Sequence, residues 1–544
     1  MERGERKTLF QFGYHRSPDQ DRSVPAHHSV IVVGAGPVGL CAAIDLAQRG
    51  VPVVLLDDAD RIGEGSRGIC YAKRTLEILD RLGVAERCLA KGVTWKVGKV
   101  FQGQELLYQF DLLPEVGHKM PAFINLQQYY LERFLVERAD DLPQLHTRWR
   151  NKVSSIVPGA DHVTLTIETP DGPYQLMADW VIAADGARSS LRQMLGLDFQ
   201  GEVFEDRFLI ADVRMRGDFP SERWFWFDPP FHEGRSALLH KQPDDVWRID
   251  LQLGPGADAL EEQKPERVLP RLRQMLGQSD FSLEWVSVYT FQCRRLERFV
   301  QGRVLFVGDS AHQVSPFGAR GGNSGIQDAE NLAWKLALVV KGEAPASLLE
   351  TYDIERSAAA DENIGHSTRS TDFIAPRSAQ ELRFRDAVLA LARRAPFAKR
   401  MVNSGRLSTP SVYTSPLTTP DAGTWQGTAR LGAPLPDVPL LDRSGRPVWL
   451  LDAVGGDEVV IQVAAEDEPP RMEGRRSLVI GSDLIDSEGL FAQRYDATPG
   501  AAYLVRPDQH LAARWRVLDP SAVANASLRL RGGLHRHGER DDAA

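Results

Sequence analysis

The fold is decided by residues 29–57, which have the sequence SVIVVGAGPVGLCAAIDLAQRGVPVVLLD. The apolar run 29–33 predicts a buried parallel strand, and the spacing of apolar residues over 37–49 predicts a helix. A second apolar run, 51–57, predicts the next strand. Such a strand–helix–strand unit opens a doubly wound α/β sheet.

The turn between the first strand and the helix is the glycine motif GAGPVG. Gly34 permits the tight turn, Gly36 allows a pyrophosphate to approach the backbone, and Gly39 allows close packing of helix and strand. Asp57 ends the second strand, where a ribose-binding carboxylate is expected; Asp58 fits the register less well. The motif predicts dinucleotide binding but does not distinguish FAD from NAD.

Two later strands also end in turns that contain an aspartate. The strand 178–184 leads into Asp185-Gly186-Ala187-Arg188-Ser189, and the strand 303–307 leads into Gly308-Asp309. A carboxylate at the second turn is placed to accept hydrogen bonds from a polyol such as the ribitol of a flavin.

The segment 316–323, PFGARGGN, precedes a strong helical pattern over 325–341. This arrangement puts backbone N–H groups and the positive end of a helix dipole beside any group that the loop holds. A reduced flavin is negatively charged near N1, so the helix end would stabilise it.

These ordered motifs (GAGPVG, ADGARS, and GDSAH followed by GGNSGIQDAENLAWKL) resemble those of the single-component FAD-dependent aromatic hydroxylases, the branch of phenol hydroxylase, pentachlorophenol monooxygenase and 3-(3-hydroxyphenyl)propionate hydroxylase. The resemblance covers roughly residues 29–535. It implies a set of FAD-binding positions, from the ADP half through the pyrophosphate and ribitol to the isoalloxazine ring: Gly34, Gly36, Gly39, Asp57, Arg67, Gln127, Asp185, Gly308, Asp309, Pro316, Gly321, Gly322 and Asn323. Arg320 departs from the glutamine common in relatives, and little effect is expected because the loop acts through its backbone.

By the same resemblance, NADH or NADPH reduces the FAD, and O2 then gives a flavin C4a-hydroperoxide that hydroxylates a small aromatic, phenolic substrate. No motif fixes a catalytic base. Strand position makes His240 and Asp250 candidates to face the substrate, together with Pro316 of the flavin loop. The aspartate that serves the hydroxyl in phenol hydroxylase would align near Ile69, so that device is not expected here.

Composition sets the broader class. The chain has 544 residues, a net charge of -9 and four cysteines without a CxxC pair. These values argue against a nucleic-acid partner, a disulfide framework or a metal site, and fit the reducing cytoplasm. No apolar run suggests a signal peptide or a membrane span. A homodimer is expected.

The expected organisation is a flexible arm at 1–28, an FAD- and substrate-binding region at 29–425 and a thioredoxin-like domain at 430–535. Within the large region, alternating segments over about 205–300 predict an antiparallel substrate sheet, and about 345–405 is helical. The last domain contains no cysteine, so it cannot carry a redox dithiol.

Several alternatives stay open. Trp224-Phe225-Trp226-Phe227-Asp228-Pro229 approaches the WxWxIP signature of flavin-dependent halogenases, although an aromatic strand or pocket wall is favoured. An FAD oxidase or dehydrogenase, or a flavin-binding sensor, would use the same scaffold. His312 is expected to be structural, Lys335 to lie on a solvated face, and Cys70 to pack near the FAD motifs, with contact to substrate as the alternative.

Overall fold

The computed structural model describes residues 11–63, 67–217, 219–277, 280–402, 407–465, 472 and 474–533. Its first sheet contains the predicted strand–helix–strand unit: β1 (Ala26–Val33) and β2 (Val53–Leu56) are parallel, joined by α2 (Pro37–Gln48). β11 (Tyr174–Ala183) lies on the other side of β1, also parallel. Beyond β11 the sheet continues with β18 (Val304–Phe306) and β17 (Val300–Gln301), and beyond β2 it ends with β8 (Leu145–Arg148). β10 (Val163–Glu168) pairs with β11 and with β9 (Lys152–Pro158).

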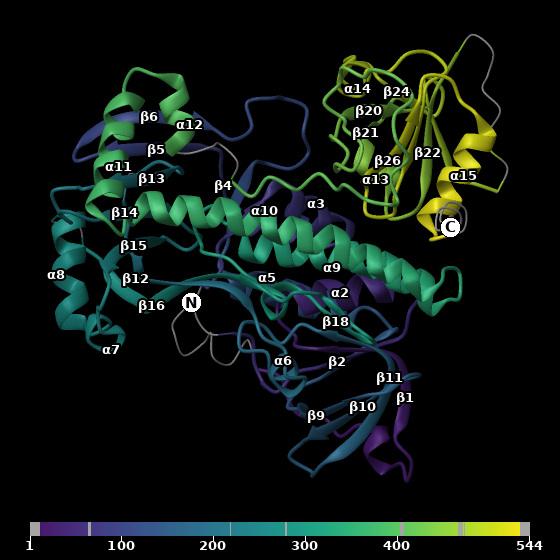
Figure 1. Ribbon diagram of the computed structural model, residues 1–544, viewed down its shortest axis with the longest axis horizontal. Coiled ribbons are helices and arrows are strands. Elements are labelled where there is room, and N and C mark those ends of the chain that lie inside the picture. Colours follow the sequence, from purple (N-terminus) through teal and green to yellow (C-terminus); the bar gives the residue numbers. More distant parts are fainter. Residues whose placement is uncertain are drawn as a thin grey trace, which may run out of the picture.

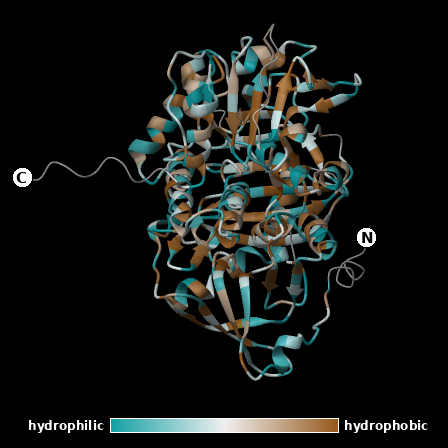
Figure 2. Cartoon of the chain, turned by 90° about the vertical axis from the view of Figure 1, so that its right-hand side faces the viewer, coloured by the Kyte–Doolittle hydropathy of each residue, from teal (hydrophilic) through white to brown (hydrophobic). Residues whose placement is uncertain are grey.

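Apolar helices cover this sheet, as its near-continuous apolar strands require. α2 begins with a proline at its first turn, where the missing N–H costs nothing. It packs against α5 (Gln128–Asp140) and α9 (Gly321–Val340). Figure 2 shows hydrophobic residues gathered in these inner strands and helices.

The second sheet contains the antiparallel strands predicted over about 205–300, together with a parallel pair, β13 and β5. It is called the substrate sheet below, and its contact with substrate stays a prediction. Its strand order is β19-β16-β12-β15-β14-β13-β5-β6. The outer face is covered by α8 (Pro265–Leu276), whose Val268 and Leu272 pack against Trp247 and Ile249. The strand bounds are β19 His312–Gln313, β16 Ser282–Arg295, β12 Gln200–Arg214, β15 Val246–Gly254, β14 Ser236–Lys241, β13 Arg223–Phe227, β5 Val97–Gln102 and β6 Glu105–Asp111.

A small third sheet lies against the inner face of the second one. It consists of β3 (Cys70–Ala72), β7 (Phe123–Asn125) and β4 (Val93–Trp95). Trp95 meets His240 of β14 edge-on, with ring centroids 5.9 Å apart. The inner face of the substrate sheet therefore points towards the domain that is built on the first sheet.

Helices α9 and α10 (Glu350–Ile374) run side by side across the middle of the molecule (Figure 1). The prediction that Lys335 of α9 lies on a solvated face is wrong. Its side chain is 0% exposed and its Nζ lies 2.7 Å from a carboxylate oxygen of Glu355 in α10. The remaining helices are α3 (Lys73–Arg81), α4 (Ala85–Lys91), α6 (Ser190–Met194), α7 (Ala259–Glu262), α11 (Ala379–Ala392) and α12 (Pro396–Val402).

A separate α/β unit with its own core forms the C-terminal part. Its sheet order is β21-β20-β24-β23-β22-β25-β26. Its relation to thioredoxin stays a prediction. The bounds are β20 Pro439–Asp442, β21 Pro447–Trp449, β22 Val459–Val463, β23 Ser477–Ile480, β24 Leu484–Ile485, β25 Ala502–Val505, β26 Leu511–Trp515, α13 Leu450–Val454, α14 Leu490–Tyr495 and α15 Pro520–Leu530.

Part of the segment expected to be a flexible arm is packed on the first sheet. Phe12 stacks on Trp149 with centroids 4.4 Å apart. Asp19, in a short 3₁₀ helix (Pro18–Asp21), accepts a hydrogen bond of 2.6 Å from Arg148. The expectation of a loose arm therefore fails for this stretch, because an aromatic stack and a salt bridge hold it; residues 1–10 lie outside the described part. Among the described residues, no helix combines the length and the apolar character needed to cross a membrane.

Candidate functional site

The glycine turn after β1 has two glycines that the protein itself requires. Gly34 has φ +108°, and a Cβ there would lie 2.4 Å from the carbonyl oxygen of Ala184. A Cβ on Gly39 would lie 1.9 Å from the oxygen of Gly34. Gly36 is different, because a Cβ there would meet nothing within 4 Å. The backbone at Gly36, at the N-terminus of α2, thus faces open space, as the approach of a pyrophosphate requires.

Asp57, the predicted ribose carboxylate, fastens this turn from the end of β2. One oxygen accepts a hydrogen bond of 2.6 Å from the Ala35 N–H, and the other accepts one of 2.8 Å from the Ala59 N–H. Burial raises the pKa of Asp57. Each carboxylate oxygen retains further acceptor capacity, so a role towards ribose stays a prediction.

The Gly-Asp turn after β18 presents a carboxylate that has no partner in the described part of the protein. Among the described residues, no hydrogen bond or ion pair engages the Asp309 carboxylate. The residue is exposed. Even so, the protein atoms packed around the carboxylate remove part of its solvation, and this raises its pKa. Asp328 of α9 holds the turn, since it accepts a hydrogen bond of 2.9 Å from the Gly308 N–H. His312 lies 2.6 Å from the same carboxylate and is buried, in agreement with its predicted structural role.

The loop before α9 offers backbone rather than side chains. Pro316 and Gly322 are exposed, a Cβ on Gly322 would meet nothing within 4 Å, and no side chain caps the helix. Arg320 turns away and donates to Asn363 of α10 over 3.1 Å. The substitution of glutamine by Arg320 therefore leaves the uncapped N–H groups of α9 unchanged.

Asn323 acts inside the protein, as a clamp on β3. Its Oδ1 accepts a hydrogen bond of 2.9 Å from the Ala72 N–H, and its Nδ2 donates to the oxygens of Cys70 (2.9 Å) and Ala319 (2.6 Å). Any contact of this position with a flavin is thus left to the backbone of the loop. Gly321, the first residue of α9, lies beside it.

Three other predicted positions lie around this region. Asp185 accepts hydrogen bonds from the Leu191 N–H (3.0 Å) and the Ser190 hydroxyl (3.3 Å), and its Oδ1 is buried without a partner in the described part of the chain. Gln127 donates to the Pro243 oxygen over 3.1 Å, and its Oε1 is likewise buried and unpartnered there. The side chain of Arg67 is exposed.

These features fit FAD. The open backbone at Gly36, the unpartnered Asp309 carboxylate and the uncapped α9 would hold pyrophosphate, ribitol and isoalloxazine in that order. No side chain of the described protein competes for these three places.

The inner face of the substrate sheet carries a row of charged side chains on four neighbouring strands. Arg223 of β13 stands opposite His240 of β14, His240 opposite Arg248 of β15, and Arg248 opposite Asp212 of β12. Asp250 lies two residues after Arg248 on β15 and therefore on the same face of the sheet. Both predicted substrate-facing residues, His240 and Asp250, therefore lie on the face turned towards the domain that is built on the first sheet.

Burial controls the charge of these two groups. It lowers the pKa of His240 well below its usual value, with the positive charges of Arg223 and Arg248 adding to the effect, so the imidazole is neutral. It raises the pKa of Asp250 to about 6. An acceptor with a pKa near 6 is suited to taking a phenolic proton at neutral pH.

Sequence reasoning missed Arg223. The alternation in RWFWF placed it on the same face as Phe225 and Phe227, but the neighbouring strands that surround it come from other parts of the chain.

The flavin loop and this inner face are in contact. Phe317 packs edge-on against Phe208 of β12 (centroids 5.0 Å) and Phe291 of β16 (5.2 Å). Cys70, whose oxygen binds Asn323, directs its thiol to Asn125 at 3.2 Å. The loop is therefore in contact with both β3 and the inner face of the substrate sheet.

The halogenase-like tryptophans lie elsewhere. Trp224 and Trp226 alternate with Arg223 and Phe225, so they project from the outer face, where they join the cluster under α8. Trp226 stacks on Phe101 with centroids 5.3 Å apart. They belong to an aromatic strand, as favoured above, but not to a wall of the site.

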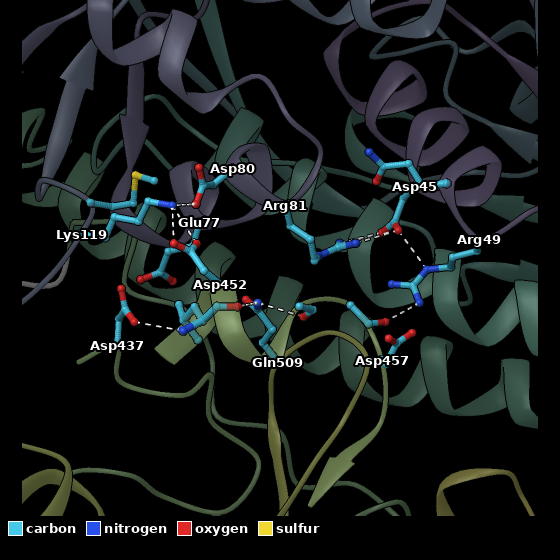
Figure 3. A pocket seen from close by; sticks show the side chains of 15 residues that line it. Asp45, Arg49, Glu77, Asp80, Arg81, Lys119, Asp437, Asp452, Asp457 and Gln509 are labelled. Atoms are coloured by element: carbon cyan, nitrogen blue, oxygen red, sulfur yellow. Dashed lines mark hydrogen bonds and ion pairs between the residues drawn. The ribbon is translucent and has the colours of Figure 1, made fainter. Parts of the chain in front are cut away.

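A cavity of about 530 Å³ lies away from this chemistry, between α2, α3 and the C-terminal unit (Figure 3). Its charges are satisfied within the protein: Asp45 pairs with Arg49 (2.9 Å) and Arg81 (2.7 Å), and Lys119 pairs with Asp452 (2.7 Å). The geometry of the FAD motifs, rather than the volume of this cavity, identifies the candidate site.

Comparison with known proteins agrees with the site. The family described as FAD binding domain matches residues 27–367, more than half of the chain. A 6-methylpretetramide 4-monooxygenase of Streptomyces rimosus is 32% identical over 89% of this chain and 90% of its own length. A 3-(3-hydroxy-phenyl)propionate/3-hydroxycinnamic acid hydroxylase of Klebsiella pneumoniae is 30% identical over 71% of this chain and 69% of its own.

A solved structure, the flavin-dependent monooxygenase PieE in complex with FAD and substrate, superimposes with a TM-score of 0.79 at 23% identity and covers 94% of this chain and 100% of its own. This likeness concerns the fold. Together with the matched sequence family, it confirms the resemblance stated from the three motifs. The chain belongs to the FAD-dependent flavoprotein monooxygenases, the family of the single-component aromatic hydroxylases.

Proposed function

We propose that this protein hydroxylates a small phenolic compound, with NADH or NADPH as reductant and O2 as oxygen donor. The observation that carries the proposal is the contact between the flavin loop and the inner face of the substrate sheet, through Phe317, Phe208 and Phe291. On this proposal a flavin ring would lie beside an inner face that carries Phe208 and Phe291 near the loop and Arg223, His240, Arg248 and Asp212 farther away.

The chain would hold FAD through groups that have no competing partner in the described part of the protein. Gly36 and the α2 N-terminus would meet the pyrophosphate, Asp309 the ribitol, and the backbone from Gly321 to Asn323 the ring. When bound, FAD supplies the redox and oxygen-transfer chemistry, while the protein supplies binding and orientation.

The substrate-facing residues would manage a proton. Asp250 is the best candidate to accept the phenolic proton, because its carboxylate is partly free and its pKa lies near 6. Removing that proton makes the ring carbons more nucleophilic. His240, neutral and buried beside Trp95, would orient the hydroxyl rather than act as a base. Pro316 is exposed at the loop and would face the ring from the other side.

The test is a substrate screen with the purified holoenzyme. NADH and NADPH are each mixed with phenols, hydroxybenzoates and hydroxyphenylpropionates, and reductant loss and product mass are followed under ¹⁸O2. At least one phenol should accelerate reductant loss and gain one ¹⁸O atom. Accelerated turnover without ¹⁸O would instead indicate an oxidase or dehydrogenase, and a chloride-dependent product a halogenase.

Further parts of the proposal concern organisation. The unit at 430–535 is proposed to be thioredoxin-like: in the order β23-β22-β25-β26, β22 is parallel to β23 and antiparallel to β25, and β25 is antiparallel to β26. The working form is proposed to be a homodimer, which sedimentation velocity would test.

A further inference from the structure

One charge on the inner face of the substrate sheet lacks a counter-ion. In the row of charged side chains, Arg248 is neutralised by Asp212, which accepts hydrogen bonds of 2.9 and 3.2 Å from it. Arg223, at the end of the row, has no such partner. In the part of the chain that the structure describes, no hydrogen bond or ion pair joins its guanidinium to another group.

The neighbours of Arg223 do not compensate its charge. The negative charge of Asp250 acts on it only across a distance beyond an ion pair. Burial raises the pKa of the Cys70 thiol to about 12, so no thiolate forms, and His240 is neutral. Burial also lowers the pKa of Arg223, yet an arginine stays protonated in proteins. Arg223 is only partly buried, and a guanidinium with no carboxylate partner among the described residues is able to bind an anion there.

The position of Arg223 relative to the flavin loop defines where that anion would lie. Phe208, which touches the loop, Ile210 and Asp212 are successive inward positions of β12, so they mark three rows across the sheet. Neighbouring rows are roughly 7 Å apart, since a strand rises about 3.4 Å per residue. Arg223 lies in the row of Asp212, roughly 14 Å from the row that meets the loop.

The row in between is mostly apolar. It contains Phe225, Leu238, Asp250 and Ile210, which follow one another across the four strands. An aromatic ring over this row would approach the loop on one side and point its far substituent to Arg223 on the other.

We propose that Arg223 binds a carboxylate carried by the aromatic substrate, at the end remote from the ring carbon that is hydroxylated. This inference rests on the proposed function for the identity of the ring. A guanidinium fork matches a carboxylate with two parallel hydrogen bonds, whereas a phenolate offers a single oxygen. Arg223 is thus the residue that selects phenolic acids over neutral phenols.

The test compares wild type, Arg223→Met and Arg223→Lys, each as FAD-loaded enzyme. The probes are matched pairs: 3-(3-hydroxyphenyl)propionate and its primary amide, and 4-hydroxybenzoate and 4-hydroxybenzamide. Binding is followed by the change in flavin absorbance, which needs no turnover, and kcat/KM by oxygenated product. Arg214→Met is the matched control, because Arg214, two residues after Asp212 on β12, is already paired with Glu284 at 3.0 Å.

For at least one pair, wild type should bind the carboxylate about 30-fold or more tighter than the amide. Arg223→Met should weaken carboxylate binding about 100-fold and amide binding less than about 3-fold, while Arg223→Lys should lie between. The carboxylate should raise the Tm of wild type but not of Arg223→Met, and Arg214→Met should behave as wild type.

Two results would overturn the inference: equal binding of carboxylate and amide by wild type in every pair, or an unchanged preference in Arg223→Met with full FAD content. Failure of the proposed function is separate. If wild type binds the carboxylate through Arg223 but no aromatic compound gains oxygen, the anion site stands and the hydroxylase assignment falls.

Discussion

Arg506, in the turn between β25 and β26, donates hydrogen bonds of 2.6 and 2.9 Å to the carboxylate of Glu355 in α10. Both side chains are buried, with exposed fractions of 1% and 0%. The pair fastens the C-terminal unit to α10, which packs on α9, the helix whose N-terminus begins at the flavin loop.

The first prediction concerns this pair. Arg506→Met should lower the free energy of unfolding by about 3–5 kcal/mol, because it leaves a buried carboxylate without one of its cations. The measurement is a urea titration followed by tryptophan fluorescence. Arg446→Met is the control, since the Arg446 side chain is 81% exposed in its pair with Asp442 and the change should cost less than about 1 kcal/mol. Equal losses in both variants would show that the buried pair has no special role.

The same pair predicts an acid dependence. Although burial alone would raise it, Arg506 and Lys335 hold the pKa of Glu355 well below its ordinary value of 4.5. A depressed carboxyl pKa stabilises the fold fully above the ordinary value and loses this effect as pH falls below it. The stability difference between wild type and Arg506→Met should therefore be constant from pH 6 to pH 8 and shrink below about pH 4.5. A difference that grows on acidification would contradict the prediction.

The second prediction concerns Asp309. Its carboxylate makes no hydrogen bond within the described protein, so Asp309→Ala should leave the Tm of the apoprotein unchanged or slightly higher. It should weaken FAD binding about 10- to 100-fold, because charge-assisted hydrogen bonds to the ligand are lost. Fluorescence titration of the apoprotein with FAD measures this effect.

Asp328→Asn serves as the comparison for Asp309→Ala. Asp328 binds Gly308, His312 and Arg356 inside the protein, so its loss should reduce both stability and FAD affinity. If Asp309→Ala behaved in the same way, Asp309 would be structural rather than a ligand of FAD.

The third prediction concerns Asp250. Its folded pKa of about 6 exceeds the ordinary value of 3.8, so the ionised form opposes folding. This cost is complete above pH 6 and disappears below 3.8. Asp250→Asn should thus raise the free energy of unfolding by roughly 1–3 kcal/mol at pH 8, and the gain should decline as pH falls from 7 to 4.

The activity of Asp250→Asn should fall, whereas its stability should rise. If Asp250 accepts the phenolic proton, kcat/KM of wild type falls below about pH 6 and Asp250→Asn loses that inflection together with most of its rate. The control is Asp141→Asn, because the Asp141 side chain, at the C-terminal end of α5, is 71% exposed. An unaltered pH profile in Asp250→Asn would remove Asp250 from the mechanism.

The fourth prediction concerns Trp226 on the outer face. Trp226→Phe should lower the free energy of unfolding by about 1–2 kcal/mol through lost contact with Phe101 and Phe231. It should leave the product and KM nearly unchanged, with chloride without effect. A halogenated product from wild type, or loss of oxygenation in the variant, would mean that this strand belongs to the active site after all.

Local sequence was sufficient where a function depends on neighbours in the chain. The glycine turn, the two aspartate turns and the loop before α9 were all predicted, because a turn needs only a few adjacent residues of the right backbone freedom. The prediction from sequence was wrong for Lys335, because this polar position of the amphipathic helix α9 faces α10 rather than water. It also failed for the segment at 11–25, since polar residues there form pairs with distant parts of the first sheet.

The sequence by itself determined the doubly wound FAD-binding architecture and the family of this protein, because those depend on short motifs in a fixed order. Tertiary structure alone decided which charges lack partners. Arg223 and Arg248 both lie in strands whose residues alternate between the two faces of the sheet, and nothing in the local sequence distinguishes them. Only the pairing of four strands gives Arg248 its carboxylate and leaves Arg223 without a counter-ion among the described residues, since a counter-ion is a property of position in space rather than of order along the chain.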